Sequence, residues 1–290
     1  MPHPVHRARS FSRRRVLAGA LGGAAALVGY AMIVEPRFRL VVTQYDLSPP
    51  GWPRDFPLTI AVISDLHASE PYMGPARIER VVTEANGLNA DVIILLGDYV
   101  TKGVPAPDYA KFFTKLRAPL GVHGILGNHD WWSGVGEVRR TLAAANVPLL
   151  ENAAVRLVKN GRPFWVLGLG DQLAHIIGER RFRGVDDLPG TLAKIDDSAP
   201  AILLAHEPDI FVEVPARIAL TLSGHTHGGQ MRVLGWSPIS PSRYGNRFAY
   251  GHIVEGNRHL VVSGGLGTSI MPARLGVPPE IVLIRLGDHA

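Results

Sequence analysis

The residues best suited to chemistry stand in five short clusters of Asp, His and Asn. These are Ser64-Asp65-Leu66-His67, Gly97-Asp98, Gly127-Asn128-His129-Asp130, His206-Glu207 and Gly224-His225-Thr226-His227-Gly228-Gly229. Together they offer carboxylate, imidazole and amide groups, and the chain has no cysteine. Such donors suit Mn, Fe, Zn, Co or Ni rather than a soft metal. One Asp or His after a strand is more often a cap or turn former, but five clusters in series predict a metal centre.

Each cluster directly follows a short apolar run, which the pattern predicts to be a buried strand. The runs cover residues 59–63, 92–96, 124–126, 201–204 and 219–222, and helical patterns cover 76–88, 108–116 and 135–145. In open α/β sheets, sites form at the carboxyl ends of strands. We therefore expect the five clusters to meet in one crevice.

Two turn signals indicate antiparallel strands in the second half of the chain. Asn160-Gly161 predicts a hairpin over residues 156–168, and Gly256-Asn257 predicts another over 252–262. The mixture predicts an α/β fold with sheets layered between helices. No linker or repeat interrupts residues 37–290, which we interpret as one domain.

The order and spacing of the clusters resemble the signature of calcineurin-like metallophosphoesterases across residues 58–230. Two later segments, 263–269 and 278–281, resemble an exported or membrane-associated subgroup. That subgroup contains a cell-wall-associated phosphoesterase and lipid A enzymes, the UDP-2,3-diacylglucosamine pyrophosphatases. The resemblance implies a four-layer αββα sandwich of mixed sheets, with the metal site at the carboxyl ends of the strands.

The resemblance also implies a centre with two divalent ions, which could be Mn, Zn, Fe or Ni. Asp65, His67 and His227 would hold one ion, and Asn128, His206 and His225 the other. Asp98 would bridge them, because a carboxylate between two cations offsets their repulsion at a separation of roughly 3.5 to 4 Å.

In the implied mechanism a hydroxide between the ions attacks phosphorus, and the protein adds no covalent nucleophile. His129 would donate a proton to the leaving oxygen. Asp130 would hold that imidazole and keep it protonated, or would only cap the following turn. Purple acid phosphatases place a tyrosine ligand where this chain has Thr101, so we expect no ferric tyrosinate centre.

The stretch after the last cluster supplies candidates for substrate contact, although a solvated surface position is the commoner fate of an arginine and is preferred for any single one of them. They are Arg232, Arg243, Tyr244, Arg247, His252 and Arg274. Trp131 and Trp132 could line a pocket for a sugar, base or acyl group, or could pack inside the domain.

The sequence of the N-terminus predicts an export signal. Ser12-Arg13-Arg14-Arg15 precedes an uncharged, Ala- and Gly-rich stretch at 16–34, as in a twin-arginine signal. An ordinary secretory signal and a membrane anchor are the alternatives. With 19 residues the stretch is long enough to span a bilayer, and cleavage after Ala31 or retention as an anchor both stay open. We expect a periplasmic or cell-envelope protein that uses the twin-arginine export machinery.

The formal charge of +5 comes from the N-terminus. Five arginines precede the first acidic residue, and the remaining 25 basic residues equal the 25 acidic ones. We therefore expect no nucleic-acid partner. The expected function is hydrolysis of a phosphate monoester, diester or pyrophosphate in a small-molecule or lipid-linked substrate of the envelope. The alternatives are a broad nucleotide phosphodiesterase and a non-catalytic binding protein on the same fold.

Overall fold

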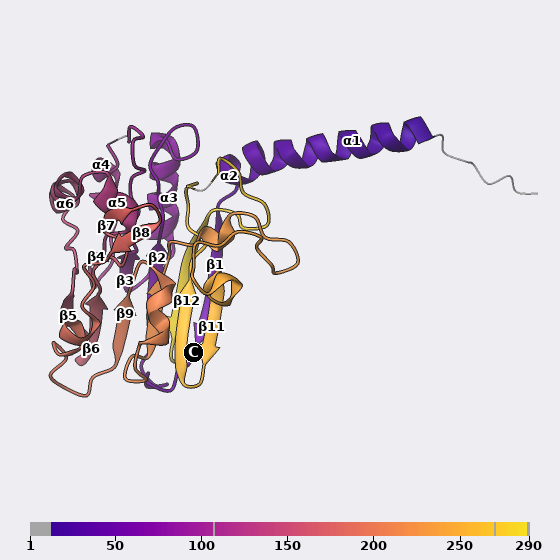
Figure 1. The fold of residues 1–290 in the computed structure, drawn as a ribbon. Helices are drawn as coiled ribbons and strands as arrows, with labels where there is room; N and C mark the ends of the chain where they lie inside the picture. Colours follow the sequence, from indigo (N-terminus) through magenta and orange to yellow (C-terminus); the bar gives the residue numbers. More distant parts are fainter. Residues whose placement is uncertain (1–12, 107, 270, 289–290) are drawn as a thin grey trace, which may run out of the picture.

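Two sheets pack face to face, and their central strands are short apolar runs (Figure 1). The computed structural model describes residues 13–106, 108–269 and 271–288. The first sheet has the order β1 (Val41–Leu47), β13 (Glu280–Leu286), β2 (Leu58–Ile63), β3 (Val92–Leu95), β4 (Val122–Gly124). The second has the order β11 (Gly251–Glu255), β12 (Arg258–Val262), β10 (Leu220–Ser223), β9 (Ala201–Leu204), β6 (Arg162–Gly168), β5 (Ala153–Lys159). A separate hairpin pairs β7 (His175–Gly178) with β8 (Arg181–Arg183).

The five strands that precede the polar clusters are parallel within their sheets. β2, β3 and β4 run parallel in the first sheet, as β9 and β10 do in the second. The third expected strand starts earlier than residue 124 and ends at Gly124. Both expected hairpins are present, as β5 with β6 and β11 with β12.

Successive side chains of a strand point to opposite faces of the sheet, and both faces of the central strands are covered by apolar cores. Ile60 and Val62 of β2 face the core between the two sheets, where Phe164 and Ile202 meet them. The intervening Ala61 and Ile63 face a second core under the helices. A strand that is covered on both faces has no position left for a solvated side chain.

Helices cover the outer faces of the sheets. α3 (Pro75–Gly87) packs on the first sheet through Ile78, Val81, Val82 and Ala85, with α4 (Ala110–Phe113) and α6 (Val135–Ala144) beside it. The outer face of the second sheet carries only short turns, α7 (Leu188–Leu192) and the 3-10 helix η2 (Pro208–Val212). The expected layered α/β fold is confirmed, with a thin fourth layer.

A long N-terminal helix leaves the domain (Figure 1). It comprises α1 (Arg13–Gly29), the π-helical η1 (Tyr30–Val34) and α2 (Glu35–Phe38). An 18-residue stretch of this helix has a mean hydropathy of 1.9, and the helix is long and apolar enough to cross a membrane. No α1 residue is buried, whereas Ala31, Glu35 and Pro36 are buried against the domain. Of the proposed export motif, Ser12 lies outside the described residues.

Candidate metal centre

The carboxyl ends of strands from both sheets bring the predicted ligands together. One group consists of Asp65, His67, Asp98 and His227, each with a ligand atom within 4.8 Å of the others. A second group meets the same criterion and consists of His206, Glu207 and His225. Six of these seven residues are buried, and His225 is half-buried.

Asp98 lies between the two groups. Its Oδ2 is 3.4 Å from His67 Nε2 in the first group and 3.3 Å from His206 Nε2 in the second. Asn128 joins the second group, with Oδ1 at 2.9 Å from His225 Nδ1. All seven expected ligands therefore converge, and Asp98 occupies the position between the two sets.

The backbone at the ligands is itself unusual. Five of the seven have a positive φ: Asp65 (50°), His67 (43°), Asp98 (55°), His225 (67°) and His227 (52°). Non-glycine residues adopt this left-handed conformation at a cost of about 1–3 kcal/mol each, and such residues cluster at functional sites. The strand ends therefore turn sharply, which aims successive side chains at one point.

Two glycines in the clusters are required by close approach. A Cβ atom on Gly127 would overlap Asp98 Oδ1 and come within 2.6 Å of His206 Cε1. A Cβ on Gly224 would overlap the side chains of Ser64 and Asp65. A larger residue at either position would therefore displace the expected ligands.

The tautomer of His206 shows that the site fits a cation. His206 Nδ1 lies 2.7 Å from the carbonyl oxygen of Leu96, which can only accept, so Nδ1 carries the proton. Although burial opposes the charged form, the carboxylate of Asp98 raises the pKa of His206 well above its ordinary value, so a positive charge is favoured at this position. Nε2 faces Asp98 Oδ2 at 3.3 Å, and among the described residues it has no hydrogen-bond partner. A metal ion between the two atoms would supply that positive charge, with the neutral imidazole as its ligand.

The other imidazoles are also suited to metal binding. Burial lowers the pKa of His67 and of His225 to about 3, so both rings are neutral at neutral pH. A neutral imidazole is the form that ligates a metal. His67 Nε2 and His227 Nε2 approach to 3.1 Å, so both rings are aimed at the same point.

Asp130 makes the contacts of the second role that the sequence left open for it, that of a cap. Its carboxylate accepts hydrogen bonds from the backbone nitrogens of Asp98 (2.8 Å), Tyr99 (2.8 Å) and Gly127 (2.9 Å). His129 instead contacts Ser269 Oγ, which lies 3.2 Å from its Nε2. Asp130 therefore fixes the loop that carries Asp98 and caps the start of α5 (Asn128–Trp132), and the imidazole of His129 is held elsewhere.

The sequence interpretation missed two acidic residues beside the second group. Glu207 directly follows His206, but no ligand role was assigned to it, and Asp171 had no motif around it. Burial, and then the charge of Glu207, raises the pKa of Asp171 well above its ordinary value. Among the described residues Asp171 Oδ2 and Glu207 Oε1 have no hydrogen-bond donor, so the pair is suited to share one proton.

Most candidates for substrate contact already have partners within the protein. Arg243 pairs with Asp209 and Arg247 with Glu255, whereas Arg232 donates to Ser237 Oγ. Arg274 is fully buried, so it is neither the solvated surface residue that was preferred nor the candidate for substrate contact. Its guanidinium donates to the carbonyl oxygens of Gly267 and Val277, and its Nη2 lies 3.2 Å from Nδ1 of the expected ligand His227. Arg274 therefore supports an expected ligand from the interior of the protein.

The two tryptophans contact the β7–β8 hairpin, Trp131 through His175 and Trp132 through Phe182, and Trp132 also lies beside His129. Trp132 donates from Nε1 to the Leu173 carbonyl oxygen at 3.0 Å, and its ring centroid lies 5.1 Å from that of His129. The ring of Trp132 also stacks on Phe182 of β8. The pair therefore links the β7–β8 hairpin to the proposed proton donor.

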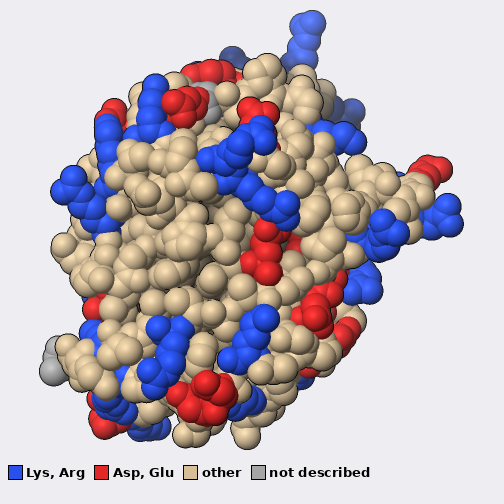
Figure 2. All heavy atoms as spheres, turned by 90° about the vertical axis from the view of Figure 1, so that its left-hand side faces the viewer, with Lys and Arg blue, Asp and Glu red and all other residues tan. Residues whose placement is uncertain are grey.

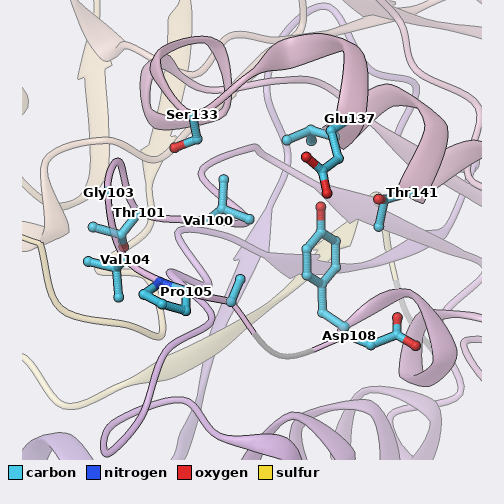
Figure 3. A pocket seen from close by; sticks show the side chains of 12 residues that line it. Val100, Thr101, Gly103, Val104, Pro105, Asp108, Ser133, Glu137 and Thr141 are labelled. Carbon is cyan, nitrogen blue, oxygen red and sulfur yellow. The ribbon is translucent and has the colours of Figure 1, made fainter.

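A cavity of about 630 Å³ adjoins the centre (Figure 3). It lies between the loop around Thr101–Pro105 and the α6 residues Glu137 and Thr141. Thr101 connects it to the centre, with Oγ at 2.9 Å from His67 Nδ1. Figure 2 shows Lys, Arg, Asp and Glu interspersed around a broad uncharged area on the face that it presents.

A family model described as calcineurin-like phosphoesterase matches residues 58–229, the span that contains all seven converging ligands. The chain belongs to the calcineurin-like phosphoesterase family. It is accordingly a hydrolase of phosphoester bonds, and its buried His and Asp groups indicate divalent metal ions as cofactors.

This calcineurin-like phosphoesterase has full-length and partial relatives. The Bacillus subtilis protein "uncharacterized metallophosphoesterase YkuE" is 30% identical over 294 residues, which cover 96% of this chain and 98% of that protein. The Escherichia coli phosphodiesterase YaeI is 30% identical over 241 residues, which cover 79% and 82%. A Bos taurus "transmembrane protein with metallophosphoesterase domain" is 30% identical over 246 residues, which cover 79% and 53%.

Solved structures also resemble this calcineurin-like phosphoesterase. A 5'-nucleotidase precursor of Thermus thermophilus is 14% identical, with a TM-score of 0.48. The match covers 80% of this chain and 54% of the nucleotidase, so this chain spans about half the length of that protein.

Proposed function

We propose that this phosphoesterase uses two divalent ions to hydrolyse a phosphate monoester, diester or pyrophosphate bond. The observation that carries the proposal is the position of Asp98 Oδ2, within 3.4 Å of imidazole nitrogens from both ligand groups. One ion would be held by Asp65, His67 and His227, and the other by Asn128, His206 and His225, with Asp98 shared. Bound divalent ions supply Lewis acidity toward the phosphoryl group and make water a nucleophile near neutral pH.

In this proposal His129 is the proton donor to the leaving oxygen. It is half-buried at the edge of the centre, and its ring lies edge-on to His67 with 4.8 Å between the centroids. The contact with Ser269 Oγ and the packing of Trp132 fix the orientation of the ring. A positioned imidazole of this kind contributes about 10²–10⁴-fold to proton transfer.

We further propose that the natural substrate is an envelope or lipid-linked phosphate, with a broad range of nucleotide diesters as the alternative. The apolar N-terminal helix supports the first choice, as does the likeness to a transmembrane protein with a metallophosphoesterase domain. In this view the twin-arginine machinery exports the folded protein, and the domain at 37–290 stays attached to the envelope.

Retention of the helix as an anchor is favoured over cleavage after Ala31. The carbonyl oxygen of Ala31 accepts a 2.8 Å hydrogen bond from the backbone nitrogen of Arg274, the residue behind His227. Glu35 Oε1 accepts another, at 2.9 Å, from the Val277 nitrogen. Cleavage after Ala31 would break the first of these contacts.

The test is elemental analysis of the full chain together with hydrolysis of a chromogenic phosphodiester, for wild type, Asp98→Ala and the exposed control Asp55→Ala. We expect about two ions per chain in wild type and control, with loss of both metal and activity in Asp98→Ala. One ion per chain in an active wild type would refute the two-metal proposal. A panel of monoesters, diesters, nucleotides and lipid-linked pyrophosphates then decides the substrate, and the highest kcat/KM on nucleotides would favour the alternative.

A further inference from the structure

An exposed apolar loop follows the last metal-binding cluster. Within residues 233–239, Val233, Trp236 and Ile239 are each at least half exposed, and Leu234 is fully exposed. Val233 and Trp236 pair their backbones in both directions, at 2.9 and 3.0 Å, so the loop is a tight hairpin with Leu234 at its tip. Soluble surfaces seldom gather large apolar side chains in this way without a partner.

The loop is attached to the base of the N-terminal helix through one intermediate segment. Arg232 N donates to the Leu275 carbonyl oxygen, and Leu275 N donates to the Gln230 carbonyl oxygen, both at 2.8 Å. The neighbouring Arg274 and Val277 then bind Ala31 and Glu35. The orientation of the loop relative to the start of the helix is therefore fixed by hydrogen bonds.

The other side of the helix base is also secured. Arg77 of α3 donates to the carbonyl oxygens of Arg37 and Arg39. In Figure 1 the loop after β10, coloured orange, projects on the same side of the domain as α1. A bilayer crossed by α1 would consequently meet this side of the domain first.

The chemistry of this side fits a lipid surface. The apolar stretch at 16–34 has 19 residues, which as a helix rise about 28 Å, close to the thickness of a hydrocarbon core. Arg37 and Arg39 follow its domain end, and Arg243 is exposed beyond the loop, where guanidinium groups suit lipid phosphates. Tryptophan prefers the membrane interface, and Leu234 is apolar enough to enter it.

We propose that the loop at 233–239 rests in the headgroup region of the bilayer that the N-terminal helix crosses, as a second contact of the domain with lipid. Its occupant is a phospholipid surface. The loop follows His225 and His227 closely in the sequence. Its contact with lipid would therefore hold the metal centre near the membrane. The inference rests on the proposed retention of the helix as an anchor, and it favours a lipid-phase phosphate as substrate.

Because the chain has no cysteine, single cysteines can report the depth of chosen positions. Leu234→Cys, Leu21→Cys in the helix and Val158→Cys on β5 are all at exposed positions. Each full-length variant is labelled with an environment-sensitive fluorophore and reconstituted into phosphatidylglycerol–phosphatidylethanolamine nanodiscs. Quenching by doxyl-labelled lipid is compared with quenching by aqueous iodide.

We expect doxyl lipid to quench the labels at 234 and 21 several-fold more than the label at 158, and iodide to show the reverse order. A label at 234 that behaves like the one at 158, while the one at 21 is quenched by lipid, would refute the loop contact and keep the anchor. Shielding of 234 from both quenchers would indicate a second protein chain and also refute it. If the label at 21 is not quenched by lipid, the anchor and the inference both fail.

Hydrolysis of a soluble chromogenic diester is measured on the same nanodiscs. We expect unchanged rates for Leu234→Cys, because the loop is outside the proposed catalytic machinery. This readout separates the lipid contact from the proposed function, since a protein without activity can still show the depth pattern, and an active protein can lack it.

Discussion

The carboxylate of Asp130 accepts a 2.8 Å hydrogen bond from the backbone nitrogen of Asp98. Two further bonds, from Tyr99 and Gly127, are completed by the same fully buried side chain. The loop that presents the Asp98 carboxylate is therefore held by a neighbouring carboxylate whose oxygens are engaged by backbone nitrogens.

Replacement of Asp130 by Asn should weaken this support with little change of shape. An amide cannot accept all of these bonds, and its NH2 group would face backbone donors. We expect metal affinity to fall about 10–100-fold, as for other residues that orient ligands. Titration with Mn²⁺ measures the change, and Asp209→Asn, a buried carboxylate that accepts from Arg243 N, is the matched control. Equal affinities in both variants would leave Asp130 as a turn cap only.

His129→Ala should separate chemistry from metal binding. We expect kcat to fall about 10²–10⁴-fold for esters with poor leaving groups, because the leaving oxygen then departs without a proton. The fall should be much smaller for a nitrophenyl ester, and metal content should stay near that of wild type. His259→Ala, at a half-buried histidine of β12 outside the centre, serves as control. Uniform loss across leaving groups would argue for a role in binding instead.

Gly127→Ala should disrupt the centre through a single methyl group. The added Cβ would displace Asp98 or His206, so we expect metal affinity to drop at least about tenfold and the thermal midpoint to fall. The control is Gly87→Ala at the end of α3, where no atom lies within 4 Å of the new Cβ. Metal content and calorimetry on both variants check this. A Gly127→Ala protein with full metal content would contradict the overlap.

Removal of metal should lower the melting temperature of the whole domain. A ligand that binds only the folded state stabilises it by about 2.7 kcal/mol when its free concentration is 100 times Kd. Calorimetry in a series of metal buffers should therefore show a midpoint that rises with the logarithm of free metal. Asp98→Ala should show no such slope, and a slope of equal size there would place the stabilising ion at another site.

The site could be predicted from the sequence where its residues directly follow a strand. Each ligand follows the end of a strand, so strand patterns and motif spacing were enough to predict the sheets and the converging ligands. The expected helix at 108–116 proved to be the short α4, because burial of Phe112 and Phe113 fixes only one turn there.

The supporting residues could not be predicted in the same way. Asp130 acts on a loop 31 and 32 positions earlier, and Arg274 lies behind a histidine 47 positions before it. An arginine is seldom fully buried, so its sequence environment indicated the surface. Only the tertiary fold shows that carbonyl oxygens of Gly267 and Val277 satisfy it.

The convergence of both sheets on one centre has a mechanical consequence. Asp65 follows strand β2 of the first sheet, and His225 follows strand β10 of the second. The two residues are 160 positions apart, and the backbone nitrogen of His225 donates to the Asp65 carboxylate. In a protein without cysteine, ions bound at this junction would act as a reversible cross-link between the two sheets. Unlike a disulfide, such a link would depend on the supply of metal, so scarcity of metal would weaken the contact between the sheets at the metal centre itself.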